Sequence, residues 1–474
     1  MTPLETHPAA ARSVPQSATP WRHEIVETLK LATPMAATQL GQIAMMTTDL
    51  ALLGRLGDQV VAAAALAHTV LFAGYALGMG LVSAVAPLAS QAFGARQPRL
   101  VRRSVRVGLW AALLAGVPLT ALQLWGGEAI LLALGQPQDT AELAGRYLAG
   151  LSWCLIPSWA FIALRNFMSA VNRPEPGLWI TLWAIPLNAV LGYALIYGTL
   201  GAPRLGILGA GVATTLVNVA MCAAAVWFAY ARRPFKKFQV LGRFWRADWI
   251  LLRRLLVVGV PISAAFLLEF GMFAAASLLM GSIGAAALAA HAIALQTAAI
   301  LFMVPFGISL AATVRVGQAA GRRDADGTRR AGFAAIWLAV AFMAAMTLAV
   351  VAFRRLVPLL FLGTDAQAAA ETVALAATLL AVGATFFVTD GLQTVAAGAL
   401  RGLNDTRVPL LAAVVGYWVA GFGAGYGLAF VLGFGALGVW AGLSIGTTVF
   451  ALLLLWRFHA LTRAGYLPAM PGST

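Results

Sequence analysis

Three acidic residues of this chain lie inside long apolar segments, where a carboxylate is costly. Glu269 stands within FLLEFGMFAAASLLM (266–280), about 22 Å along a helix from Arg254 at a rise of ~1.5 Å per residue. By the same rise, Asp390 lies about 16 Å from Arg401. An isolated charge at the centre of a bilayer costs about 2.5–3.5 kcal/mol, so each group must face a cavity, a partner or a proton. Because loss of water favours the protonated form, the two acids suit proton exchange, or binding of Na⁺ through hard oxygen ligands.

The third acid, Asp49, lies six residues before Arg55 and therefore nearer to the end of its segment. Asn188, Thr214 and Thr215 stand in two later apolar segments, where their side chains could reach Asp49. Hydrogen bonding between helices without a further function explains the same residues. Both interpretations of this second polar group stay open.

A substrate cavity has its own candidate residues. Met272 and Phe273 follow Glu269 closely, and His291 and Gln296 stand in the next apolar segment. Methionine and aromatic side chains can form an adaptable wall for varied ligands. At helical spacing, however, such residues are often ordinary packing, and a buried histidine is often a core residue.

The elements that carry these residues are predicted to be membrane-spanning helices. The 474 residues are 61% hydrophobic and only 10% charged, with a mean hydropathy of +0.85. A helix needs about 20 apolar residues to cross a bilayer, and barrel strands are much shorter. We expect an all-α polytopic protein with twelve spans, at 25–53, 60–92, 106–126, 142–168, 177–200, 206–230, 254–281, 285–318, 331–353, 372–399, 408–431 and 436–458.

The basic residues predict the orientation of these spans. If both termini are cytoplasmic, 27 of the 32 Lys and Arg residues lie on the cytoplasmic side. The net charge of +15 is then a sign of topology, and we expect no nucleic-acid partner. The linker ARRPFKKFQVLGRFWRADW (231–249) alternates basic and aromatic residues, which is typical of contact with lipid headgroups. The preference for Arg over Lys suggests a bacterial source, so we expect a multi-pass protein of a bacterial inner membrane.

The chain also contains an internal repeat. A shift of 227 residues aligns Pro34 with Pro261 and QAFGAR (91–96) with QAAGRR (318–323). Each half holds six spans in the same orientation, and parallel repeats predict two lobes that rock about a cavity between them. We expect a cytoplasmic tail (1–21), an N-lobe (22–230), a basic linker (231–253), a C-lobe (254–460) and a second cytoplasmic tail (461–474).

Motifs of enzymes and of ATP-driven pumps are missing from the sequence. It has no H-E-x-x-H, no G-x-S-x-G and no Walker loop. Cys154 and Cys222 both lie in apolar runs and predict neither a disulfide framework nor a metal cluster. We therefore expect no enzyme activity and no cofactor other than a coupling ion.

Other transport functions stay open. A flippase for lipid-linked oligosaccharide or a cell-wall precursor shares the broad two-lobed architecture. It would more naturally carry Arg or Lys in its cavity, and the sequence places neither within the spans opposite Glu269 and Asp390. Export of an endogenous metabolite is a further alternative. A receptor or channel subunit would need neither the repeat nor a titratable pair.

Taken together, the chain resembles the multidrug and toxic compound extrusion (MATE) family, and its acids look like those of the NorM-type bacterial branch. The resemblance covers about residues 22–460. The segments that carry it are MTTDLALLGRLG (46–57), PISAAFLLEFGMFAAASLLMGSIGAAALAAHAIALQ (261–296) and DGLQTVAAGALRGLNDTRVP (390–409).

The resemblance implies a V-shaped pair of six-helix lobes and export of amphiphilic organic cations in exchange for inward H⁺ or Na⁺. It implies that Glu269 and Asp390 couple the ion in the C-lobe, as Na⁺ ligands if sodium is used, and that Asp49 belongs to an N-lobe site. Many members carry an aspartate one turn after the position of Asn188, where this chain has Gly192. The N-lobe site would then consist of Asp49, Asn188, and Thr214 or Thr215. We expect a monomer whose partners are cationic amphiphiles and membrane lipids.

Overall fold

The computed structural model describes residues 21–199, 201–242, 244–246, 248–362 and 370–469, and within these ranges every regular element is a helix. The tail expected at 1–21 lies outside the described residues except for its last residue, and so do residues 470–474 of the C-terminal tail. The first half contains α1 (Trp21–Gly54), α2 (Asp58–Ser83), α3 (Val85–Gly94), α4 (Pro98–Ala133), α5 (Gln138–Leu151), η1 (Ser152–Cys154), α6 (Leu155–Ala170), α7 (Glu175–Tyr197) and α8 (Ile207–Ala231).

A short segment, η2 (Phe235–Phe238), connects the two halves. The second half contains α9 (Trp249–Ile283), α10 (Ala285–Gly321), α11 (Ala325–Ala352), α12 (Val357–Leu362), α13 (Ala370–Val382), α14 (Ala384–Gly402), α15 (Arg407–Ala413), η4 (Val414–Phe422), α16 (Gly423–Tyr426), η5 (Gly427–Val431) and α17 (Ala436–Arg463). The helix α9 begins at Trp249, inside the segment that the sequence assigned to the linker.

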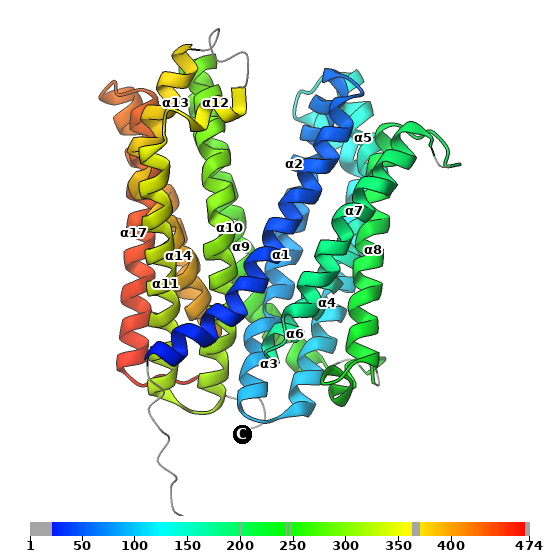
Figure 1. Ribbon diagram of the computed structural model, residues 1–474, viewed down its shortest axis with the longest axis vertical. Helices are drawn as coiled ribbons and strands as arrows, with labels where there is room; N and C mark the ends of the chain where they lie inside the picture. The colour runs from blue at the N-terminus through cyan, green and yellow to red at the C-terminus, as the bar shows by residue number, and fades with distance from the viewer. Residues whose placement is uncertain (1–20, 200, 243, 247, 363–369, 470–474) are drawn as a thin grey trace, which may run out of the picture.

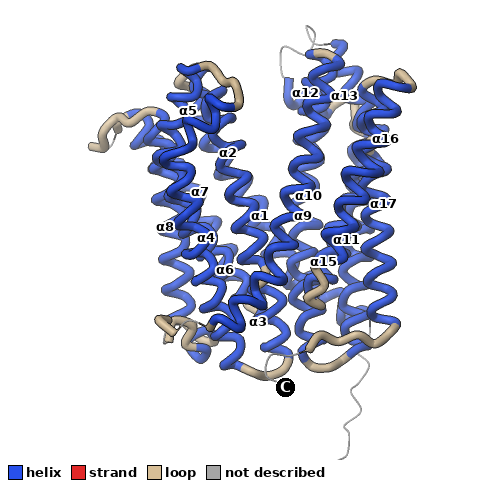
Figure 2. Tube along the Cα trace, turned by 180° about the vertical axis from the view of Figure 1, so that it is seen from behind, coloured by secondary structure: helices blue, strands red, loops and turns tan. Residues whose placement is uncertain are grey.

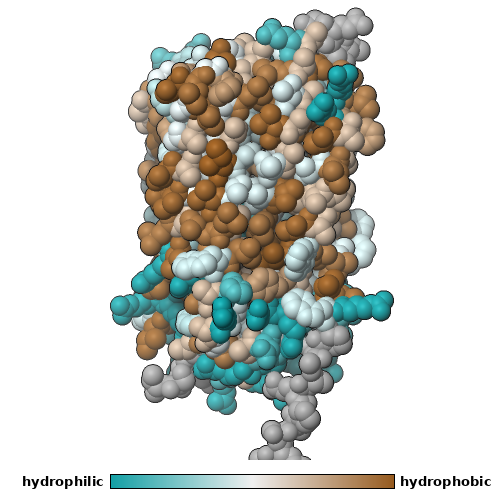
Figure 3. Space-filling model, turned by 90° about the vertical axis from the view of Figure 1, so that its left-hand side faces the viewer, coloured by the Kyte–Doolittle hydropathy of each residue, from teal (hydrophilic) through white to brown (hydrophobic). Residues whose placement is uncertain are grey.

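The helices form two lobes that meet at one end and diverge at the other, so that the molecule has the shape of a V (Figures 1 and 2). One lobe contains α1 to α8 and the other contains α9 to α17. The start of α1 and the end of α17 both lie at the closed end of the V (Figure 1). Hydrophilic residues gather at this same end, and apolar residues cover most of the remaining height of the face in Figure 3.

The number of spans differs from the twelve expected. Among the described residues, ten helices are long and apolar enough to cross a membrane, and there are up to eleven if the bent pair α13 and α14 forms one span. The helix α1 has 34 residues but does not belong to this set. Its many Thr, Gln and Gly residues lower its hydropathy, so length and composition do not confirm the count of twelve.

The first helix of each half packs against both lobes. In α1, Leu31 and Met35 belong to the apolar core of the C-lobe, whereas Leu53 belongs to that of the N-lobe. The helix α9 does the reverse, because its first part packs in the N-lobe core and its second part in the C-lobe core. Pro34 and Pro261 lie inside these helices, where a proline removes a backbone hydrogen bond and favours a bend.

Two reciprocal contacts at the crossing of α3 and α10 join the lobes at the closed end. The end of α3 passes the end of α10 so closely that a Cβ on Gly94 would lie 2.1 Å from the carbonyl oxygen of Gln318. A Cβ on Gly321 would lie at the same 2.1 Å from the carbonyl oxygen of Gln91. Only glycine allows the two backbones to approach in this way.

The side chains of Gln91 and Gln318 each form hydrogen bonds with the opposite lobe at this crossing, and we name these two residues the glutamine clamps. The side chain of Gln91 donates to the carbonyl oxygen of Gly402 at 2.8 Å and accepts from the amide of Asn404 at 2.9 Å. The side chain of Gln318 contacts the corresponding place in the N-lobe, where it donates to the carbonyl oxygen of Ala170 at 3.0 Å and to Oδ1 of Asn172 at 2.9 Å. The repeat therefore produces two nearly symmetric sets of hydrogen bonds between the lobes, which we call the lock.

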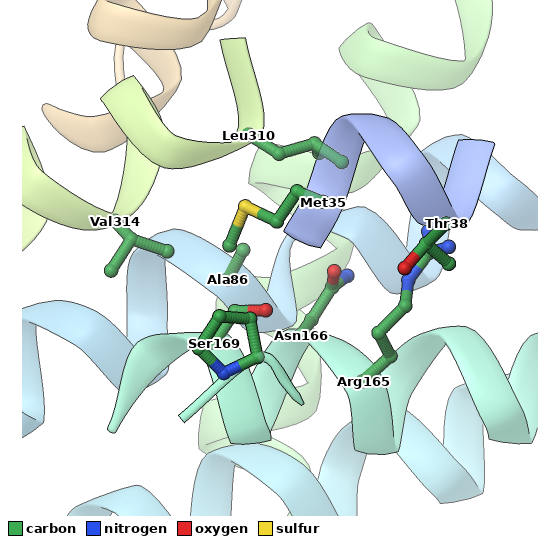
Figure 4. A pocket seen from close by; sticks show the side chains of 9 residues that line it. Met35, Thr38, Ala86, Arg165, Asn166, Ser169, Leu310 and Val314 are labelled. Carbon is green, nitrogen blue, oxygen red and sulfur yellow. The ribbon is translucent and has the colours of Figure 1, made fainter. Parts of the chain in front are cut away.

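Apolar side chains fill the space above this lock. Met35 of α1 lies beside Leu310 and Val314 of α10, with Arg165 of α6 on the far side of the same small pocket (Figure 4). The buried Arg165 donates to Oε1 of Gln39 at 2.8 Å. Contacts among α1, α6 and α10 thus leave little free volume between the lobes near the closed end.

Candidate functional site

Two carboxyl groups of the C-lobe meet at one amide. Glu269 comes from the middle of α9, and Asp390 and Gln393 lie one turn apart on α14. The amide nitrogen of Gln393 donates to Asp390 Oδ1 at 3.0 Å and to Glu269 Oε1 at 3.2 Å. Tyr417 of η4 donates its hydroxyl to the same Glu269 oxygen at 3.1 Å. The structure therefore brings together the two acids that the sequence singled out.

The hydrogen bonds that the described residues make to the C-lobe pair come only from neutral donors. Both accepting oxygens lie within 3.2 Å of the same nitrogen, so they are at most about 6 Å apart. Two full charges at that separation repel by about 3 kcal/mol at an effective dielectric constant of ~20. The neutral donors reduce this cost only in part, so a proton or a small cation bound between the carboxyl groups would be stabilised.

A small cavity lies next to Glu269. Its volume of ≈ 30 Å³ is enough for a water molecule. Gln393, Tyr417, Arg401 and Thr406 line the cavity together with Glu269. Glu269 thus borders a space in which water or an ion can be held.

Arg401 corrects one expectation from the sequence. The sequence placed no Arg or Lys opposite the acids, because Arg401 stands eleven residues after Asp390. Side chains near the C-terminus of a helix point back towards its N-terminus. The guanidinium group of Arg401 therefore lies over the ring of Phe266, 5.1 Å from its centre, and lines the cavity that Glu269 also lines.

The N-lobe holds one carboxylate with a donor for each oxygen. Asn188 of α7 donates to Asp49 Oδ1 at 2.6 Å, and the hydroxyl of Thr214 of α8 lies 3.0 Å from Oδ2. Thr215, the neighbouring candidate, donates instead to the carbonyl oxygen of Gly150 at 2.7 Å. Asp49 is 6% exposed. The structure thus groups Asp49 with Asn188 and Thr214 and places Thr215 on a different partner.

Gly192 lies beside the helix that carries Asp49. A Cβ at this position would come within 2.9 Å of the side chain of Leu52. Tyr197, one turn further along α7, donates to the carbonyl oxygen of Leu52 at 2.7 Å. The side chain of Leu52 therefore packs against α7 at the position where the resemblance implies a second acid.

Several residues of both sites could not be singled out from the sequence. In the N-lobe, Asn218 donates to the carbonyl oxygen of Thr214 at 2.8 Å and accepts from Ser158 at 2.7 Å. In the C-lobe, Gln393 and Tyr417 complete the site. The one available signal was the spacing of Gln393, because a residue three positions after Asp390 shares its helix face.

The candidates for a substrate cavity lie in different surroundings. Met272 and His291 are each 1% exposed and belong to the interior of the C-lobe. His291 accepts at Nδ1 from Trp440 at 3.1 Å, and its Nε2 lies 3.1 Å from the hydroxyl of Ser277. The ring of Phe273 packs edge-on against Phe386. Gln296 is exposed on α10. A role of these four residues in substrate binding stays a prediction.

Comparison with known proteins identifies the family. The MatE family model matches residues 34–194 and 261–427. The chain belongs to the MATE family. It is 61% identical to the "Probable multidrug resistance protein NorM" of Rhodopseudomonas palustris, over 98% of this chain and 97% of that protein. It is 56% identical to a protein of the same description from Bradyrhizobium diazoefficiens, over 98% and 99% of the two chains.

Solved structures of MATE proteins share the fold. A crystal structure of a MATE protein in the straight conformation superimposes with a TM-score of 0.84 at 20% identity, over 93% of this chain and 97% of that one. A eukaryotic MATE transporter gives a TM-score of 0.82 at 20% identity, over 94% and 98%. The predicted MATE membership, with its NorM-type branch, and the predicted V-shaped helical fold are confirmed.

Proposed function

We propose that this protein is a secondary active antiporter that exports amphiphilic organic cations in exchange for inward H⁺ or Na⁺. The observation that carries the proposal is the pair Glu269 and Asp390, which share the one amide nitrogen of Gln393 beside a water-sized cavity. The proteins of Rhodopseudomonas palustris and Bradyrhizobium diazoefficiens that resemble this chain are described as probable multidrug resistance proteins. That description agrees with the export of varied substrates.

The proposed orientation of the protein in the membrane follows from the distribution of its basic residues. With both termini in the cytoplasm of a bacterial cell, the closed end of the V faces inwards and the open end faces outwards. The arrangement in Figure 1 is then the outward-facing state, from which substrate leaves and into which the coupling ion enters. The glutamine clamps are the contacts that must break before the lobes can open to the cytoplasm.

Coupling rests on competition for the negative charge of the C-lobe. With no ion bound, the two carboxylates repel each other, and a cationic substrate relieves that repulsion. A proton or Na⁺ from outside relieves it more locally by binding between the carboxyl groups. Because each cation reduces the affinity for the other, ion entry releases the substrate, and the ion-loaded form returns inwards.

The test is ethidium efflux from energised vesicles, with a Na⁺ gradient and a pH gradient imposed separately. Wild-type protein should respond to at least one gradient, and Glu269→Gln should abolish that response while ethidium still binds. The gradient that drives efflux identifies the coupling ion. Full ion-dependent efflux by Glu269→Gln, at the wild-type rate, would rule the mechanism out.

A further inference from the structure

A second cavity lies at the closed end of the V, away from the acids. It has a volume of ≈ 370 Å³ and is bordered by residues of both lobes. The N-lobe contributes the turn between α3 and α4, and the C-lobe contributes the end of α10. Phe238 of η2, the clamp Gln318 and its hydrogen-bond partner Asn172 also border it. We name this cavity the seam pocket.

Three guanidinium groups border the seam pocket. Arg315 is held by Glu24 of α1, whose Oε1 lies 2.7 Å from Nη2 and 3.0 Å from Nε. Arg96 and Arg322 are exposed, and among the described residues neither makes an ion pair. The seam pocket thus offers two free guanidinium groups next to a third that is fixed in place.

The two acidic residues that act on the charge of Arg322 each have another partner. Glu24 is engaged by Arg315, and Asp324 accepts from the backbone N–H of Gly327 at 2.7 Å at the start of α11. Although Arg322 reaches the surface, partial burial of its guanidinium group and the like charge of Arg315 hold its pKa below the usual value. Positive charge is therefore crowded at this point and would be relieved by an anion.

Part of the lining of the seam pocket is apolar. Phe93 and Phe238 lie with their ring centres 6.4 Å apart, and Pro98 and Val101 border the same space. A pocket lined by both guanidinium groups and apolar side chains suits an anion that carries an apolar part. Guanidinium groups match phosphate in particular, because they donate two parallel hydrogen bonds to its oxygens.

We propose that the seam pocket binds a phosphate-bearing anion through Arg96 and Arg322, with Arg315 as a fixed neighbour. The phosphate belongs either to the headgroup of an anionic phospholipid or to a soluble compound. Because Arg96 is in one lobe and Arg322 in the other, the occupant spans the seam and stabilises the state that is closed at this end. This last consequence rests on the proposed rocking of the lobes, whereas the binding itself does not.

The experiment measures binding by the purified full-length protein in two arms. In the first arm, inorganic pyrophosphate is titrated in detergent, and thermal stabilisation reports occupancy, because a ligand stabilises the folded form that it binds. In the second arm, the protein is placed in nanodiscs of phosphatidylcholine with or without phosphatidylglycerol. Saturable stabilisation by pyrophosphate indicates a soluble phosphate source, and stabilisation only by phosphatidylglycerol indicates a lipid source.

The decisive variant combines Arg96→Gln with Arg322→Gln. Its matched control combines Arg99→Gln with Arg323→Gln, which removes the same charge from the same two turns but outside the seam pocket. We expect the first variant to bind at least about tenfold more weakly, a change that corresponds to the loss of roughly one charge-assisted hydrogen bond. The control should bind as the wild type does. Equal losses in both variants, or no binding in either arm, would overturn the proposal.

Discussion

In the C-lobe, Glu269 and Asp390 share the amide nitrogen of Gln393, whereas in the N-lobe Asp49 has a separate donor for each oxygen. The two halves descend from one repeat, and they still match closely at the glutamine clamps. They differ in the number of acids and in how fully each acid is hydrogen-bonded. The repeat has therefore kept similar contacts between the lobes but not a similar polar site within each lobe.

The difference shows what an ion site requires. A carboxylate that already accepts a good hydrogen bond at each oxygen has little to gain from a cation. Two carboxyl groups that share a neutral donor have more to gain, even though Arg401 lines the cavity beside Glu269. We therefore expect the C-lobe to respond to ion gradients and the N-lobe to act mainly as a polar contact among α1, α7 and α8.

Asp390→Asn should have the largest effect. The variant keeps the shape of the side chain but removes one of the two charges, so the repulsion that favours ion binding disappears. Gradient-driven ethidium efflux should fall at least tenfold, which corresponds to ~1.4 kcal/mol, towards the level of empty vesicles. Ethidium binding measured without a gradient serves as the control for folding. If efflux persisted at half the wild-type rate, Asp390 would be no part of the coupling site.

The glutamine clamps test the feature that the two lobes share, namely the matching hydrogen bonds that join them. Gln91→Ala and Gln318→Ala each remove side-chain hydrogen bonds that join the lobes at the closed end. A typical net loss of about 1 kcal/mol would shift the equilibrium about fivefold towards opening at this end. The shift should be similar for both variants because their contacts are equivalent.

Spin labels can measure this shift. Arg99 and Arg407 are exposed, lie in different lobes and do not touch the clamps. Distances between labels at these positions, in a cysteine-free background, report the fraction of molecules in which the lobes have separated at the end where they meet in this structure. A large shift in one variant and none in the other would show that the lock is not symmetric.

The sequence predicted the parts of the molecule that depend on single residues or on local spacing. The apolar runs located nearly all the helices, and the cost of a charge in lipid singled out Glu269, Asp390 and Asp49. Hydropathy does not reveal which lobe a helix packs against, so the double packing of α1 and α9 was not anticipated. Gln393 was missed because an amide carries no desolvation signal comparable to that of a carboxylate.

Asp49→Asn should have the smallest effect on transport and a clearer effect on stability. The side chain remains polar and of the same size, but its hydrogen bonds with Asn188 and Thr214 become neutral instead of charge-assisted. The hydroxyl of Thr214 must also accept from the new amide while it donates to the carbonyl oxygen of Ala210. We expect a loss of about 1–3 kcal/mol in the free energy of unfolding, seen as a lower melting temperature. Gradient-driven efflux should stay within about threefold of the wild type, a difference below ~0.7 kcal/mol.

Asp390→Asn provides the matched comparison for Asp49→Asn, because it makes the same chemical change in the other lobe. If the N-lobe variant lost gradient response as completely as the C-lobe variant, a single well-bonded carboxylate would suffice for coupling. The number of hydrogen bonds to an acid would then not decide which lobe senses the ion. The contrast between the two sites would instead reflect packing, because the side chain of Leu52 would have to move before a larger residue could replace Gly192.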